Sequence, residues 1–167
     1  MVNGTLKTVK GDVTNPQRTK DNEIVVIPHC CNNLGVMGAG VALALKRNWP
    51  EVETTYHQYS LDLGNVSFYT HKKKNGLIDV VVANMIGQNG TVSIDNSKPV
   101  KYVALVEAMK RVVRVYKDIS LRSGREVVIH CPKFGSDLAG GNWDFILELI
   151  REIWIENGID VVVYEFE

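Results

Sequence analysis

The stretch IVVIPHC at residues 24–30, followed by CNNLGVMGAGV at residues 31–41, decides the fold. Its first seven residues are almost continuously apolar, which is typical of a strand covered on both faces of a parallel sheet. A glycine-rich loop then leads directly into a helix that stops before Pro50. The same order of apolar strand, glycine-rich loop and helix returns from residue 126 onward. We therefore expect two central parallel strands, each followed by a loop and a helix.

The remaining elements alternate along the chain. Strand-like segments rich in β-branched residues are expected at residues 6–9, 24–30, 66–71, 78–86, 126–131 and 159–166. Helical patterns cover residues 39–48, 51–60, 100–122 and 143–157. Residues 67–82 indicate a hairpin whose turn is formed by the lysines and Asn75-Gly76. These elements predict one domain over residues 1–167, an α/β fold with three α/β/α layers and a central mixed, mostly parallel sheet.

Charge and cysteine content exclude several classes of function. Lys+Arg and Asp+Glu both number 19, so no global positive field favours direct nucleic-acid binding. Three cysteines cannot form the even disulfide framework of a small secreted protein. The sequence has no apolar leader and no apolar run long enough to span a membrane. We expect a cytoplasmic protein that has no membrane partner and binds any anion locally.

Two glycine-rich loops are the candidate ligand site. In the first, residues 31–41, the backbone can approach a ligand closely, and the helix N-terminus that follows offers N–H groups to phosphate oxygens. The second, PKFGSDLAGGNW at residues 132–143, has the same placement after the other central strand. Neither contains a P-loop, and Leu43 stands where a Rossmann fingerprint has its third small residue. Either the glycines only shape two connections, or both loops meet at one crevice suited to a diphosphate.

With both loops in view, the chain resembles the macrodomain family, especially its ADP-ribose-1''-phosphate phosphatases and its glutamate-type ADP-ribosyl hydrolases. The resemblance rests on Gly11-Asp12-Val13, on residues 29–41 and on residues 132–143. It implies that Asp12 accepts a hydrogen bond from the adenine amino group. It also implies an aromatic ring beside adenine at Tyr164, and an asparagine, Asn32, facing the distal ribose.

The ligand set that follows from the resemblance covers the first turn, both loops and the last strand. Its predicted members are Asp12, Val13, Asn32, Gly38, Ala39, Gly40, Val41, Phe134, Gly135, Ser136, Leu138, Ala139, Gly140, Gly141, Asn142 and Tyr164. The predicted ligand is ADP-ribose or ADP-ribose-1''-phosphate, free or, as an alternative, carried by an ADP-ribosylated protein.

Departures from the family pattern bear on the reaction. Relatives that remove ADP-ribose from glutamate use a lysine and an aspartate at positions that are Gln88 and Ala139 here. Neither residue can form a lysyl adduct or act as its acid/base partner, which argues against that route. Asp137 stands where relatives usually have glycine, so it either contributes a carboxylate to the site or points to solvent from a permissive turn.

We expect a phosphatase in which water attacks the 1''-phosphate, with a non-catalytic reader of ADP-ribose or an ADP-ribosyl-protein hydrolase as alternatives. No cysteine has an arginine six residues later, which argues against a phosphocysteine. Asn32 would position the terminal phosphate, and His29 or Asp137 would activate the water. Alternatively, His29 at the end of a buried strand is purely structural. No cofactor or metal is expected, since His29-Cys30 and His130-Cys131 are strand neighbours that point to opposite faces.

Overall fold

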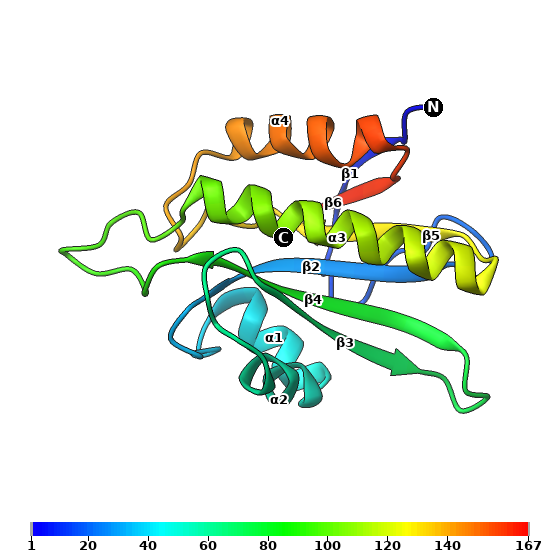
Figure 1. The fold of residues 1–167 in the computed structure, drawn as a ribbon, viewed down its shortest axis with the longest axis horizontal. Helices are drawn as coiled ribbons and strands as arrows, with labels where there is room; N and C mark the ends of the chain where they lie inside the picture. The colour runs from blue at the N-terminus through cyan, green and yellow to red at the C-terminus, as the bar shows by residue number, and fades with distance from the viewer. Residues whose placement is uncertain (1, 167) are drawn as a thin grey trace.

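The computed structural model describes residues 2–166, which form one six-stranded sheet flanked by four helices (Figure 1). The strand order is β1-β6-β5-β2-β4-β3, and only β3 runs antiparallel to its neighbour. The strands are β1 (Leu6–Lys10), β2 (Ile24–Asn32), β3 (Val66–Lys72), β4 (Ile78–Gln88), β5 (Val127–Pro132) and β6 (Val161–Glu165). The predicted mixed, mostly parallel sheet is confirmed, and the two apolar strands β2 and β5 are adjacent at its centre.

The helices cover the sheet on both faces, which gives the predicted three layers. Figure 1 shows α3 and α4 on one face and α1 and α2 on the other. Their bounds are α1 (Gly40–Asn48), α2 (Glu51–Gln58), α3 (Tyr102–Ser123) and α4 (Trp143–Ile153). Among residues 2–166, no helix is both long enough and apolar enough to cross a membrane.

Two hydrophobic clusters hold the layers together, one on each face of the sheet. Leu105 and Met109 of α3 and Ile146 of α4 pack on one face. Leu45 of α1 and Tyr56 of α2 pack on the other. Alternate residues of β2 enter the two clusters, and residues 24–27 are at most 1% exposed. The nearly continuous apolar run of β2 therefore reflects burial on both faces, as its sequence predicts.

The predicted elements all occur, with differences at their ends. α1 begins at Gly40 rather than Ala39, because Ala39 has extended backbone angles and acts as the N-cap. α3 begins two residues later than predicted, at Tyr102. α4 ends at Ile153, and a separate 3-10 turn covers Ile155–Asn157 before Gly158 adopts a left-handed conformation. β2 continues to Asn32 through an irregularity in its pairing with β4.

Candidate functional site

A cavity of about 500 Å³ opens at the carboxyl ends of β2 and β5. This is the edge where ligands bind in open α/β sheets, and the volume lies within the range of ligand pockets. The two glycine-rich loops form most of its wall, as the sequence predicts, and the loop after β4 completes it. From the predicted set it is lined by His29, Asn32, Gly38, Ala39, Gly40, Val41, Phe134, Gly135, Asp137, Leu138 and Ala139.

The first loop presents the N-terminus of α1 to this cavity. The first helical N–H groups, those of Gly40, Val41 and Ala42, have no acceptor one turn earlier in the helix. The side chain of the N-cap residue Ala39 makes no capping hydrogen bond. These N–H groups and the partial positive charge of the helix end are therefore available to an anion. Gly40 has a φ of 59°, a conformation that side chains rarely adopt.

The second loop is folded into a compact turn that is closed by backbone hydrogen bonds of its glycines. Gly141 N donates to Gly135 O at 2.8 Å, and Gly140 N donates to Asp137 O at 3.1 Å. A Cβ on Gly141 would lie 2.3 Å from Gly135 O, so this closure requires glycine. Within the described residues, the N–H groups of residues 136–139 have no acceptor. The loop thus offers a second group of backbone donors beside the first.

Most hydrogen bonds of the Asn32 side chain are made to the backbone of the first loop. Its Oδ1 accepts from Leu34 N at 3.0 Å and from Val36 N at 3.2 Å. Its Nδ2 donates to Val36 O at 2.9 Å, which leaves one amide hydrogen for the cavity. Asn32 is therefore both a wall residue and the anchor of residues 33–36.

Tyr56 of α2 is a site-forming residue that the sequence analysis missed. Its hydroxyl donates to Asn32 O and accepts from Gly35 N at 3.2 Å. Burial raises the pKa of Tyr56 above its ordinary value, so the hydroxyl keeps its proton. Because Tyr56 lies on a helix that contributes nothing to the cavity wall, no motif in the loops points to it.

His29 is one of the cavity-lining residues, but its side chain is buried and hydrogen bonded to another buried polar residue. The residue is 2% exposed, and Nε2 lies 2.6 Å from Asn84 Oδ1. Burial lowers the pKa of His29 to about 4, so the ring is neutral at pH 7. This arrangement supports the structural interpretation of His29 rather than the catalytic one.

Asp137 is an exposed carboxylate in the cavity wall and makes no side-chain hydrogen bond within residues 2–166. The other charged lining residue is Lys133, whose Nζ pairs with Glu165 at 2.9 Å. Gln88 and Ala139, the two departures from the hydrolase pattern, both line the cavity. Cys30 does as well, but burial raises the pKa of its thiol to about 12, which keeps it un-ionised and unreactive.

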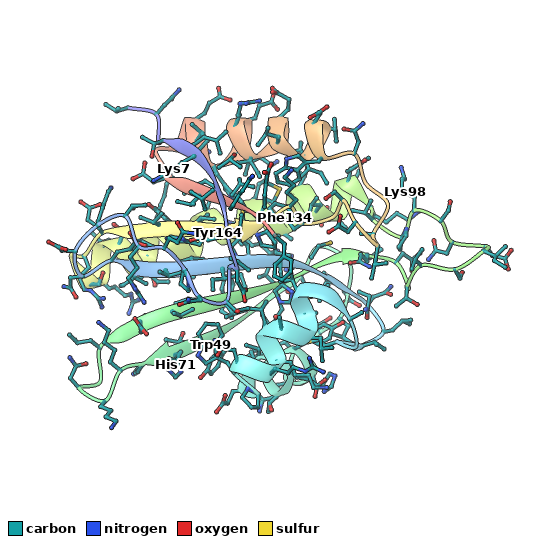
Figure 2. All side chains as sticks on the ribbon, turned by 180° about the vertical axis from the view of Figure 1, so that it is seen from behind. Lys7, Trp49, His71, Lys98, Phe134 and Tyr164 are labelled. Carbon is teal, nitrogen blue, oxygen red and sulfur yellow. The ribbon has the colours of Figure 1, made fainter. Side chains whose placement is uncertain are left out.

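Several predicted ligand residues lie outside the cavity wall. Tyr164 is 3% exposed and hydrogen bonds through its hydroxyl to His130 and Gln17, so its ring is not free to lie beside a ligand. Tyr164 is labelled in Figure 2, and it belongs to the same hydrophobic cluster as Leu45 and Tyr56. Asp12 is exposed, and its Oδ1 accepts from Thr14 N and Thr14 Oγ1. The others outside the wall are Val13, Ser136, Gly140, Gly141 and Asn142.

Two of these residues form hydrogen bonds next to the cavity wall. Asn142 caps α4 by accepting from Phe145 N at 3.1 Å. Ser136 Oγ donates to Lys133 O at 2.6 Å within the second loop.

The loop after β4 contributes Thr91 and Val92 to the wall, and neither residue was predicted from the sequence. Their position after a third parallel strand was the available signal. Among residues 2–166, no three His, Cys, Asp or Glu side chains are grouped to hold a metal.

Solved structures resemble this chain over nearly its whole length. A macrodomain protein from Streptomyces coelicolor is 33% identical, with a TM-score of 0.74 and coverage of 96% of this chain and 98% of that one. A protein of unknown function from Bacteroides thetaiotaomicron is 32% identical, with a TM-score of 0.79 and the same coverage. DarTG of Thermosipho africanus, solved in complex with ADP-ribose, is 17% identical and shares the fold, with a TM-score of 0.74 over 98% of this chain and 42% of that one.

Curated relatives are more distant, and no family model matches the chain. A chromodomain-helicase-DNA-binding protein 1-like of Danio rerio is 26% identical over 96% of this chain, which spans only 16% of that protein. The ADP-ribose 1''-phosphate phosphatase of Candida albicans is 24% identical over 77% of this chain and 81% of its own length.

Proposed function

The chain belongs to the macrodomain family, and we propose that its cavity binds ADP-ribose and ADP-ribose-1''-phosphate. One observation carries this proposal: two groups of unpaired backbone N–H groups, at residues 40–42 and 136–139, belong to adjacent loops around one cavity. A diphosphate supplies acceptors for both groups at once, and backbone donors hold phosphate without a net positive charge. The Thermosipho africanus neighbour that holds ADP-ribose supports the choice of ligand.

We further propose that the protein removes the terminal 1''-phosphate as a phosphatase. Asp137 is the one carboxylate in the wall, and it makes no hydrogen bond within the described residues. An ionised carboxylate can accept a proton from a water molecule held beside the phosphate. The remaining Nδ2 hydrogen of Asn32 would orient the terminal phosphate. His29 would act only by supporting β2, because its ring is committed to Asn84.

The reaction balances without a cofactor. The oxygen of water forms a bond to phosphorus while the bond from phosphorus to the C1'' oxygen of the ribose breaks. Asp137 takes the proton of the water and returns it to the departing oxygen, and the products are ADP-ribose and inorganic phosphate. The loop N–H groups stabilise the charge that develops on the phosphoryl oxygens. The name of the Candida albicans relative agrees with this substrate.

The test is phosphate release from ADP-ribose-1''-phosphate together with calorimetric binding of ADP-ribose. We expect Asp137→Asn to lower kcat by about 10²-fold or more, the usual contribution of a positioned base, with little change in ADP-ribose affinity. Asn32→Ala should lower both kcat and affinity, because it also releases the first loop. Asp95→Asn is the matched control, since Asp95 is an exposed aspartate that does not line the cavity.

Other outcomes separate the alternatives. Binding of ADP-ribose without release of phosphate would make the protein a reader. Release of ADP-ribose from a modified protein would make it a hydrolase that works without a lysine at Gln88. Full phosphatase activity in Asp137→Asn would remove Asp137 from the mechanism. Absence of any ADP-ribose binding by the wild-type protein would overturn the proposed function as a whole.

A further inference from the structure

A chain of buried polar side chains crosses the sheet outside the cavity. Glu23, which directly precedes β2, is 1% exposed, and its Oε2 lies 2.6 Å from His130 Nε2 on β5. His130 is fully buried, and its Nδ1 lies 2.7 Å from the hydroxyl of Tyr164 on β6. None of the three residues lines the cavity. Burying a carboxylate and an imidazole costs desolvation energy that apolar residues would avoid, so we expect Glu23 and His130 to have a role beyond stability.

The groups at the two ends set the direction of the hydrogen bonds, because the backbone N–H of Gln17 can only donate and the Glu23 carboxylate accepts. The backbone N–H of Gln17 donates to the Tyr164 hydroxyl at 2.7 Å, so the tyrosine oxygen is an acceptor there. The hydroxyl proton then goes to His130 Nδ1, and the proton on His130 Nε2 goes to Glu23 Oε2. In this order every polar hydrogen of the chain has an acceptor. Burial opposes ionisation of Glu23, but hydrogen bonds from His130 and Thr19 outweigh it and hold the pKa of Glu23 below its ordinary value.

Tyr164 and Glu23, the two ends of this series of hydrogen-bonded side chains, both bind the loop of residues 11–22, which connects β1 to β2. Tyr164 holds the backbone of Gln17, whose Nε2 donates back to Lys10 O at 2.9 Å. The other carboxylate oxygen of Glu23 accepts from Thr19 N at 3.0 Å and Lys20 N at 3.1 Å. The segment between Lys10 and Gln17 is thereby closed into a ring, and that ring contains Asp12.

Asp12 has one oxygen free for a ligand. Its Oδ1 accepts from both donors of Thr14, whereas no residue of the described chain donates to its Oδ2. The position of Oδ2 depends on the backbone of residues 11–17, because Asp12 is exposed and, within the described residues, its side chain hydrogen bonds only to Thr14 of the same loop.

We propose that Glu23, His130 and Tyr164 are positioning residues that fix the loop of residues 11–17 and thereby set the preference of Asp12 for adenine. This inference rests on the proposed function, together with the expectation from the family resemblance that Asp12 accepts from the adenine amino group. Tyr164 then acts on the ligand through the loop and not by stacking its ring on the base. The buried chain links the adenine end of the site to the central strand that begins the phosphate loop.

The test compares binding of ADP-ribose with binding of its hypoxanthine analogue, in which a carbonyl oxygen replaces the amino group. We expect Tyr164→Phe to lower ADP-ribose affinity by about fivefold, the weight of one neutral hydrogen bond, and to leave the analogue within about twofold. The selectivity ratio should therefore fall by a similar factor. Tyr116→Phe is the matched control, because Tyr116 also donates its hydroxyl to a backbone carbonyl, Val127 O, but makes no hydrogen bond to residues 11–17. It should leave the ratio unchanged.

A second measurement needs no variant. The amide of Gln17 should exchange its hydrogen slowly in the wild-type protein, because it donates to the hydroxyl of the buried residue Tyr164 in a partly buried setting. Rapid exchange of that amide, or an unchanged selectivity ratio in folded Tyr164→Phe, would overturn the inference. So would a wild-type protein that binds both ligands equally, and in that case the proposed function would stand. A wild-type protein that binds neither ligand would instead refute the proposed function.

Discussion

The hydrogen bonds of Asn84 determine which nitrogen of His29 carries its proton. Asn84 Nδ2 donates to Ser67 Oγ at 3.1 Å and to Val52 O at 3.3 Å, so its Oδ1 must be the acceptor toward His29. The proton of the neutral ring therefore lies on Nε2, and Cys31 Sγ lies 3.6 Å from Nδ1 and 3.5 Å from Nε2. A second proton on Nδ1 would find no acceptor stronger than this sulfur among the described residues. One residue at the end of β2 is thus held neutral by its surroundings.

This residue should make the stability of the protein depend on pH. Burial lowers the pKa of His29 from 6.5 to about 4, so between these values the unfolded chain binds more protons than the folded one. The free energy of unfolding should then rise with pH across this window, and the term lost on acidification is on the order of 3 kcal/mol. Urea unfolding of wild type and His29→Gln between about pH 4 and about pH 6.5 would measure it.

The variant separates His29 from other acid-sensitive groups. Glu23, whose pKa is lowered in the folded protein, also contributes stability that is lost on acidification. That loss occurs at pH values below the ordinary pKa of glutamate. His29→Gln should flatten the slope in the upper part of the range and leave the lower part intact. An equal slope in both proteins would mean that His29 is not the group that titrates.

At the scale of elements, α2 shapes a loop that belongs to another element. Tyr56 holds Asn32 and Gly35, and His57 Nε2 lies 2.7 Å from Gly35 O. Residues 33–36 are thereby fixed from outside before the chain reaches the N-terminus of α1. The orientation of the free N–H groups at residues 40–42 depends on this attachment, since the loop of residues 31–41 contains three glycines and no side-chain cap for α1.

We therefore expect Tyr56→Phe to weaken the site while keeping the hydrophobic contact of the ring. The variant should lose about 1–2 kcal/mol in the free energy of unfolding, because a buried hydroxyl with several partners is removed. ADP-ribose affinity should fall several-fold, measured by calorimetry. Tyr59→Phe is the matched control, because Tyr59 follows α2 but is 58% exposed. Equal affinities in the two variants would show that the loop keeps its shape without Tyr56.

At the scale of the whole molecule, the sequence predicts the sheet and its layers well because burial leaves a periodic pattern. The two apolar runs identify β2 and β5, and the positions of glycine identify both loops. Tyr56 and the Glu23–His130 pair were not predicted, since their partners are distant in sequence. Tyr164 was predicted as a ligand residue, but the structure commits its hydroxyl to the interior. Local patterns reveal elements and loops, whereas the contacts that position a loop depend on tertiary packing.

The charge distribution leads to a last prediction about ligand binding as a whole. Lys+Arg and Asp+Glu are equal at 19, and Lys133 in the cavity wall is paired with Glu165. Because backbone N–H groups provide the anion contacts, raising NaCl from about 50 mM to about 300 mM should weaken ADP-ribose binding by less than about threefold. Lys133→Gln should change this salt dependence little. A loss of tenfold or more in wild type would show that ionic side chains, rather than the two loops, provide most of the attraction.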